Sequence, residues 1–144
     1  MHLRVRNFLK HRDTYQHRCH NKNLLYVHII FVVKYRKKLM IGPVADTIKQ
    51  LIFDICKKHF WYIVRMESDK DHLHILLQYN PTDSITKIVT VLKSYSTFYI
   101  WKQYGSFLKK HFWKENTFWS DGYFAASVGN ASKETIEHYI ERQG

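Results

Sequence analysis

Apolar residues along the chain fall into runs that predict a β-sheet. The segment 24–34, LLYVHIIFVVK, is almost continuously apolar and rich in β-branched and aromatic residues, which is typical of a central strand. The segment 61–68, WYIVRMES, alternates as a strand, DKD forms a turn, and residues 72–79 form the next strand of a hairpin. A further short strand is expected within residues 122–129, GYFAASVG.

Two segments between these strands have the periodicity of amphipathic helices. The first begins at the breaker Gly42–Pro43, and the second follows the breaker Pro81. Each is expected to bury one apolar stripe against the sheet. The predicted inner faces consist of Val44, Ile48, Leu51, Ile52 and Ile55 in the first helix, and of Ile85, Ile88, Val89, Leu92 and Tyr99 in the second.

The final segment, NASKETIEHYIERQG, predicts a last helix that Ser132 can cap. Its inner face would hold Ile136, Tyr139, Ile140 and Gln143. Tyr139 and Gln143 are separated by four residues, so they lie on the same side of the helix, one turn apart.

The predicted order of elements, β-α-β-β-α-β-α, defines the fold class. It is an α+β fold of the ferredoxin-like, split βαβ type: an antiparallel sheet with helices mainly on one face, plus a C-terminal helix that carries Tyr139. A chain of 144 residues is about one domain. Residues 1–20 show no clear period, so we expect a basic N-terminal arm there and a single domain over residues 21–144.

The net charge of +11 is concentrated near the N-terminal end of the chain. Residues 1–40 contain ten Lys and Arg residues against one acid, whereas residues 41–144 contain thirteen against eleven. Such a basic region beside many aromatic residues favours a polyanionic partner, since cations displace counterions from phosphates and aromatic rings stack on bases. A basic protein without such a partner is the alternative on charge alone.

Cysteine content and hydropathy bear on the compartment. Cys19 and Cys56 are too few for a disulfide framework, and no N-terminal apolar run has the length of a signal or membrane-spanning segment. We therefore expect an intracellular, cytoplasmic protein without a membrane partner.

The segment KDHLHILLQYN contains the first candidate chemistry. Successive side chains of a strand point to opposite faces, so His72 and His74 project the same way. Two neutral imidazoles on one face can bind one divalent cation and leave positions for a third ligand and a substrate oxygen. The alternative is that both are polar residues on an exposed sheet face.

The last helix supplies the second candidate. The phenol of Tyr139 can act as a nucleophile on phosphorus or carbon, and the amide oxygen of Gln143 is a plausible hard ligand for a metal ion. The alternative is that Tyr139 is a partly buried aromatic residue and that Gln143 is solvated.

Three motifs occur in a specific order: KYRKK at 34–38, DKDHLHIL at 69–76 and HYIERQ at 138–143. Together with the small split βαβ body, they resemble the single-tyrosine HUH transposases of small insertion sequences and their relatives, the REP-associated tyrosine transposases. The resemblance extends from about His20 to Gln143, which is nearly the whole chain.

The resemblance implies a function and a site. His72, His74 and Gln143 would bind one Mg²⁺ or Mn²⁺, and Tyr139 would attack the scissile phosphate of single-stranded DNA. The products would be a 5′-phosphotyrosine and a free 3′-OH, and the 3′-OH of another strand would later reverse the step and join the ends.

The resemblance also implies partners. The substrate would be single-stranded DNA with hairpins at the ends of the element, and candidate DNA contacts are Lys34, Arg36, Lys37 and Lys38. The protein would form a homodimer with shared active sites and would act in the prokaryotic cytoplasm, at the nucleoid when bound to DNA. His28 matches a histidine often seen in the family, although a hydrogen-bonded histidine within the sheet is the alternative.

Two other classes of function remain open. A non-catalytic module that binds RNA or DNA would use the same fold without a metal ion and would not depend on Tyr139. A metal-dependent phosphoesterase would use His72 and His74 with a bound water molecule and would retain activity without the phenol.

Overall fold

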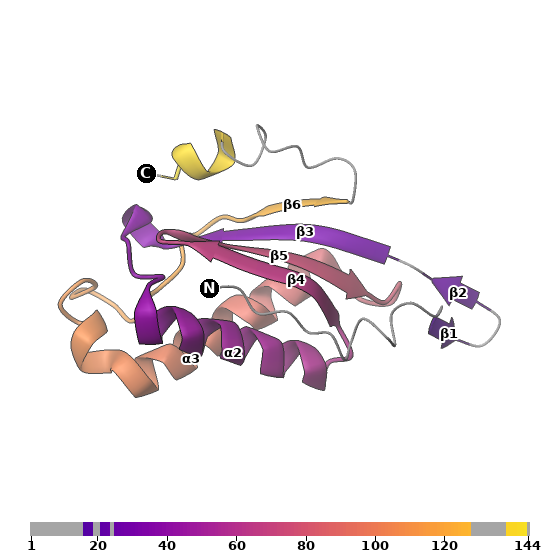
Figure 1. The fold of residues 1–144 in the computed structure, drawn as a ribbon, viewed down its shortest axis with the longest axis horizontal. Coiled ribbons are helices and arrows are strands. Elements are labelled where there is room, and N and C mark those ends of the chain that lie inside the picture. The colour runs from indigo at the N-terminus through magenta and orange to yellow at the C-terminus, as the bar shows by residue number, and fades with distance from the viewer. Residues whose placement is uncertain (1–15, 19–20, 24, 128–137, 144) are drawn as a thin grey trace.

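The computed structural model describes residues 16–18, 21–23, 25–127 and 138–143, and its body is a four-stranded antiparallel sheet covered by two helices on one face (Figure 1). The strands lie in the order β4-β5-β3-β6. Their bounds are Leu25–Val32 for β3, Tyr62–Asp69 for β4, His72–Tyr79 for β5 and Phe124–Ser127 for β6, and the helices are α2, Gly42–Lys58, and α3, Ile85–Leu108.

The connections give the sheet its split βαβ character. β3 leads through α2 to β4, yet these two strands do not pair, because β5 lies between them and is antiparallel to both. β6 pairs with the free side of β3. The α+β, ferredoxin-like fold predicted from the order of elements is therefore confirmed.

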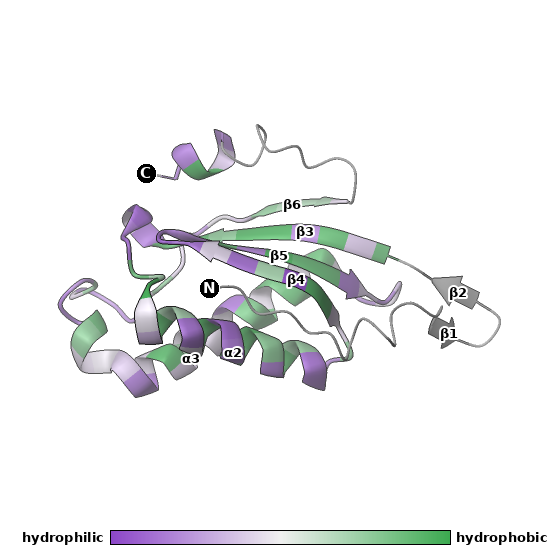
Figure 2. Cartoon of the chain, in the orientation of Figure 1, coloured by the Kyte–Doolittle hydropathy of each residue, from purple (hydrophilic) through white to green (hydrophobic). Residues whose placement is uncertain are grey.

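The core lies between the sheet and the two helices. Ile29 and Phe31 of β3 and Ile75 of β5 are fully buried there, against Ile48 of α2 and Leu92 of α3. Figure 2 shows β3 as hydrophobic along most of its length, while the helices present polar residues to the outside. Burying such aliphatic and aromatic side chains stabilises a fold by about 1.5–3 kcal/mol each, so this layer supplies most of the driving force.

A β-bulge at Val64 interrupts the alternation of β4. The register with β5 shifts between Ile63 and Arg65, so one residue of β4 has no counterpart on β5. Consequently Ile63 and Met66, three positions apart, both face the helices and are fully buried. The residues after the bulge, Arg65 and Glu67, are directed to the opposite, open face of the sheet.

The prediction that Tyr99 belongs to the inner face of α3 is wrong. Tyr99 is 37% exposed and packs beside Tyr95 and Phe98 instead of against the sheet. After Leu92 the buried stripe continues in steps of four through Ser96 and Ile100. Ser96 was not predicted as a core residue because its side chain is polar. It can be buried because its hydroxyl donates a hydrogen bond to the Leu92 carbonyl at 2.7 Å.

Two short strands lie outside the predicted elements. β1, Gln16–Arg18, pairs antiparallel with β2, Asn21–Asn23, and this hairpin spans the expected boundary between arm and domain. A single 3₁₀ turn, η1, Lys34–Arg36, follows β3. The predicted cap of the last helix, Ser132, and its inner residue Ile136 lie outside the described residues, whereas 138–141 are helical. Among the described segments, no helix has the length and apolar character needed to cross a membrane.

The start of α3 generates a stability prediction. Ser84 is its N-cap, and the Ser84 hydroxyl accepts a hydrogen bond from the Lys87 amide at 3.0 Å. Ser84→Ala is expected to lower the free energy of unfolding by about 1 kcal/mol, measured by urea denaturation. Ser94→Ala, at an exposed position within the same helix, is the control and should cause no loss. Equal stability of the two variants would contradict the role of the cap.

Candidate functional site

The open face of the sheet, away from α2 and α3, carries the predicted histidine pair. β5 alternates between residues buried against the helices, such as Leu73 and Ile75, and less buried residues on the other side. His72 and His74 belong to the second group, so the prediction that they share one face is confirmed. Their rings lie on a central strand of the sheet.

A third histidine lies beside this pair. The Nδ1 atom of His28 on β3 is 2.9 Å from the Nε2 atom of His74, a hydrogen bond between side chains 46 residues apart. Burial, reinforced by the neighbouring His28, lowers the pKa of His74 to about 4. Burial, together with the charge of Arg65, also lowers the pKa of His28. Both rings are therefore neutral near pH 7, which is the form of imidazole that binds metal ions.

A carboxylate fixes the orientation of the remaining histidine. His72 Nδ1 donates to Asp71 at 2.8 Å, and Arg36 Nε donates to the other carboxylate oxygen at 3.2 Å. Burial would raise the pKa of Asp71, but the hydrogen bonds from His72 and Arg36 outweigh it and leave this pKa below its usual value. An ionised carboxylate accepts only, so the Nδ1 atom of His72 carries a proton.

The turn after β3 holds Arg36 in this position. Tyr35 and Arg36 have φ angles of 61° and 52°, in the left-handed region that is unfavourable for residues other than glycine. Two such residues in succession store strain, which the surrounding contacts must offset. No sequence pattern predicts the contact between Arg36 and Asp71, because it joins two turns that are far apart in the chain.

A small hollow of about 70 Å³ lies next to His74. Glu67 on β4 is the direct cross-strand neighbour of His74, and Arg65 neighbours Leu76 in the same way. These side chains, together with His28, line the hollow. Glu67 could not be predicted as a residue of this site, because strict alternation along β4 does not place it on the histidine face.

Tyr139 packs on the same open face. Its helical turn, 138–141, contributes Tyr139 and Ile140 to a small cluster with Ile30 and Val32 of β3, and the Tyr139 ring lies 5.6 Å from the ring of Phe124. Figure 1 shows this turn on the side of the sheet opposite the long helices. Ile30 and Val32 are the direct cross-strand neighbours of the two histidines of β5, so Tyr139 packs one strand away from them.

The environment of the Tyr139 hydroxyl is confined. The hydroxyl is buried without a hydrogen-bond partner among the described residues, and a β-carbon added at Gly122 would lie 3.7 Å from it. Burial raises the pKa of Tyr139, although the charge of Arg142 partly opposes this effect. The phenol is therefore protonated near neutral pH and loses its proton only when a base or a cation assists.

The donor atoms of the histidine pair suit a divalent metal ion. His72 has one ring nitrogen bound to a carboxylate and no partner for the other among the described residues, which is the usual arrangement of a metal-binding histidine. His74 is neutral, and its Nε2 atom is bonded to His28. Two donors are not a complete set, and the described part of the chain contains no group of three or more His, Cys, Asp or Glu side chains placed to hold a metal ion. Gln143 is described, but within these segments its side chain has no hydrogen bond to either histidine.

In the basic run 34–38, some side chains pair with other groups of the protein and others are exposed. Lys34 forms ion pairs with two acids of the segment 115–121, at 3.3 and 3.5 Å, and Arg36 pairs with Asp71 as described. Lys37 lies 6.0 Å above an aromatic ring, and Lys38 is exposed. DNA contact by these four residues stays a prediction, and Lys38 is the one whose side chain has no partner among the described residues.

Solved structures of the same fold point to a class of protein. A crystal structure of a protein from Deinococcus radiodurans that is assigned as a transposase aligns with a TM-score of 0.81 at 28% identity, covering 90% of this chain and 98% of that one. A REP-associated tyrosine transposase bound to a REP hairpin aligns with a TM-score of 0.53 at 9% identity, covering 89% and 69%. The second likeness shows the fold alone.

Sequence comparisons identify the family. Residues 21–143 match the family model described as "Transposase IS200 like". The ISDra2 transposase TnpA of Deinococcus radiodurans is 34% identical over 116 residues, 81% of each chain. The transposase for insertion sequence element IS200 of Salmonella typhimurium is 28% identical over 116 residues, 81% of this chain and 74% of that protein. The chain belongs to the IS200-like transposase family, whose members transfer DNA strands, and the resemblance found in the sequence is confirmed.

The contact between Asp71 and His72 generates a prediction for the metal-free protein. In Asp71→Ala the imidazole loses the acceptor that holds its proton on Nδ1, so His72 is expected to shift toward the Nε2–H tautomer. The ¹⁵N chemical shifts of the ring, assigned by comparison with His72→Gln, measure the change. Asp54→Ala removes an exposed carboxylate on α2 and is the control. Unchanged His72 shifts in Asp71→Ala would contradict the assigned geometry.

Proposed function

We propose that this chain is a single-tyrosine transposase that cleaves and rejoins single-stranded DNA at the ends of an insertion sequence through a 5′-phosphotyrosine intermediate. One observation supports this most: Tyr139 packs on the sheet face that also carries His72 and His74, one strand away from them. A phenol and two imidazoles on one face would provide a nucleophile and a phosphate-binding centre together.

The bonds exchanged in this reaction balance without another reactant. The Tyr139 oxygen forms a bond to phosphorus, the bond from phosphorus to the 3′-oxygen breaks, and the phenolic proton is transferred to the leaving 3′-oxygen through solvent. One phosphodiester replaces another, so ATP is not needed. The reverse attack by a 3′-OH restores the phenol and joins the DNA ends.

The histidine face would position the phosphate for this exchange. His72, His74 and Gln143 would hold the Mg²⁺ or Mn²⁺ ion, with Asp71 keeping the His72 ring in one orientation. The ion, when bound, supplies positive charge to a non-bridging phosphate oxygen. Glu67, the cross-strand neighbour of His74, adds a carboxylate within the same hollow.

The DNA partner proposed for this chain is a single strand with hairpins at the element ends. Its support is the net charge of +11 and the basic run that includes Lys37 and Lys38. The structural neighbour bound to a REP hairpin has the same fold, which makes the proposal consistent. Phosphate contacts of this kind set affinity and position without selecting a sequence.

The covalent intermediate is the first prediction of this function. With labelled single strands that contain the element ends and with Mg²⁺, the protein is expected to form an adduct that survives SDS on a denaturing gel. Tyr139→Phe should abolish the adduct, because it lacks the oxygen that bonds to phosphorus. EDTA should also abolish it, and added Mn²⁺ should restore it. Tyr99→Phe, at an exposed tyrosine of α3, is the control and should react normally.

The two alternative functions predict different results in this gel assay. Cleavage that persists in Tyr139→Phe would favour a phosphoesterase that uses water. Tight binding of the strands with neither cleavage nor adduct would favour a non-catalytic nucleic-acid-binding module.

Sharing of active sites between two subunits is the second prediction. In the single chain Tyr139 packs on the face of its own histidines. We propose that the tyrosine turns exchange in a homodimer, so that the tyrosine of one subunit acts with the histidines of the other. Tyr139→Phe and His72→Ala should each be inactive alone, whereas co-expressed mixtures should recover part of the activity, because a mixed dimer contains one intact combination. Adduct formation on the same gel measures the recovery. No recovery from a mixture that exchanges subunits would show that each site uses its own tyrosine.

A further inference from the structure

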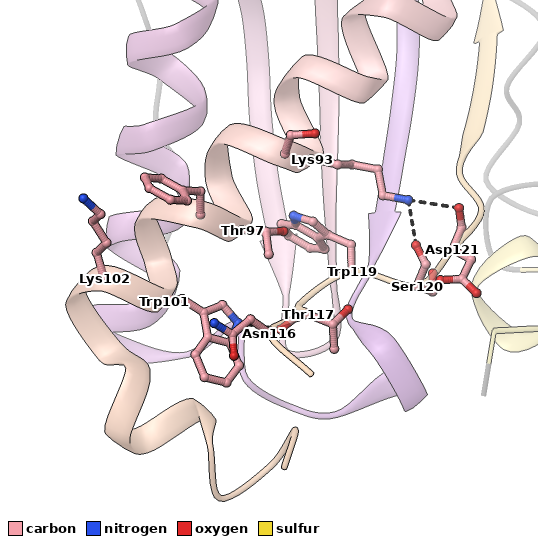
Figure 3. Close-up of a pocket in the computed structure, with 11 residues that line it drawn as sticks. Lys93, Thr97, Trp101, Lys102, Asn116, Thr117, Trp119, Ser120 and Asp121 are labelled. Atoms are coloured by element: carbon pink, nitrogen blue, oxygen red, sulfur yellow. Dashed lines mark hydrogen bonds between the residues drawn. The ribbon is translucent and has the colours of Figure 1, made fainter. Parts of the chain in front are cut away.

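A second and larger hollow lies on the helix side of the molecule, between α3 and the loop 116–121 that leads to β6 (Figure 3). Its volume is about 600 Å³, within the range of roughly 300–1,000 Å³ typical of small-molecule sites. The chemistry proposed for the histidine face does not use it. Lys93, Phe98, Trp101, Lys102, Asn116 and Ser120 are among the residues that line it.

The walls of this hollow are held by internal hydrogen bonds. Trp101 Nε1 donates to the Thr117 carbonyl at 2.8 Å, which joins α3 to the loop. Lys93 Nζ donates to the three successive carbonyls of residues 120–122, at 2.7, 3.1 and 3.2 Å, as Figure 3 shows for the first two. The hollow is therefore formed before any ligand binds, so binding does not have to order it.

Two polar groups in the hollow have no partner among the described residues. Ser120 is only 9% exposed, and its buried hydroxyl forms no hydrogen bond there. The side-chain amide of Asn116 is exposed and likewise unpaired within those segments. The Ser120 hydroxyl is itself inaccessible, so a ligand in the hollow would pair with the exposed Asn116 amide and not with this hydroxyl.

The rim of the hollow combines an aromatic ring with a cation. Phe98 is 55% exposed, and the Lys102 ammonium lies 4.8 Å from the centre of its ring. Bases of single-stranded nucleic acids stack on such aromatic faces, and their phosphates pair with neighbouring cations. A free phosphate would need the cation alone and would leave the aromatic surface unused.

We propose that this hollow binds one unstacked base of single-stranded DNA. Phe98 and Trp101 supply aromatic surface, the Asn116 amide forms hydrogen bonds with the base edge, and Lys102 faces the adjacent phosphate. The choice of DNA as the polymer rests on the proposed function, whereas the preference for a base follows from the lining itself.

The hollow and the tyrosine share one loop. Ser120 and Asp121 line the hollow. The next residue is Gly122, whose carbonyl also accepts from Lys93 and where an added β-carbon would lie 3.7 Å from the Tyr139 hydroxyl. A base bound in the hollow thus anchors the strand near the element that carries the proposed nucleophile. This anchor would limit which phosphate reaches the open face.

The test measures binding of the full chain to a labelled single strand without a hairpin, by fluorescence anisotropy. Tyr139→Phe is the background, so that no strand is cleaved. Adding Phe98→Ala is expected to weaken binding roughly tenfold, as for loss of one stacked base. Phe60→Ala, which removes a 64% exposed ring from the loop between α2 and β4, is the matched control and should bind normally.

Strands with a single abasic position distinguish a base from a phosphate. One abasic position should weaken binding as much as Phe98→Ala does, and the variant should no longer respond to it. Unchanged affinity in Phe98→Ala would overturn the proposal. A loss in Phe98→Ala that is the same for every abasic strand would also overturn it, because it would mean backbone contact only.

The test of the base-binding hollow can fail or succeed independently of the test of the proposed function. Adduct formation by the chain with its tyrosine intact tests the chemistry, and the abasic response tests the hollow. A chain that forms no adduct but shows the response of Phe98 to one abasic position would retain the base-binding site and lose the transposition mechanism. An adduct without a response to any abasic position would support the transposition mechanism and overturn the base-binding site.

Discussion

The pairing of β3 with β5 is the constraint on which the rest of the site depends. In one continuous antiparallel register it sets Ile30 opposite His74 and Val32 opposite His72. Ile30 and Val32 pack against the helical turn that carries Tyr139, and His72 and His74 form the candidate phosphate-binding centre. A shift of one residue would send the histidines into the helix-packed core and the core residues into solvent, so burial of that core keeps the register fixed.

Two irregular features of the structure position the side chains around the histidines: a bulge in β4 and a strained turn after β3. The bulge at Val64 redirects the following residues of β4, so that Glu67 faces His74. The strained turn after β3 brings Arg36 to Asp71, which in turn orients the His72 ring. Each device acts at a point where regular geometry would direct a side chain elsewhere, and each costs local order or strain that the packed core offsets.

Periodic features could be predicted from the sequence, and irregular ones could not. The continuous apolar run of β3 and the hairpin turn before β5 come directly from local preferences, and so does the shared face of His72 and His74. The bulge at Val64 breaks the period of two, and its position depends on how Ile63 and Met66 fit the core. Contacts between distant turns, such as Arg36 with Asp71, have no local signature, because tertiary packing alone brings the two together.

The separation of His28 from His74 along the chain has a consequence for the order of folding. The two rings meet only after a loop of 46 residues closes, so no partial structure built from local contacts contains the site. The long strands β3, β4 and β5 all precede α3, while Tyr139 follows the whole sheet. A chain emerging from the ribosome therefore completes its histidine face first and gains the proposed nucleophile afterwards, so an unfinished chain lacks the group on which the proposed reaction depends.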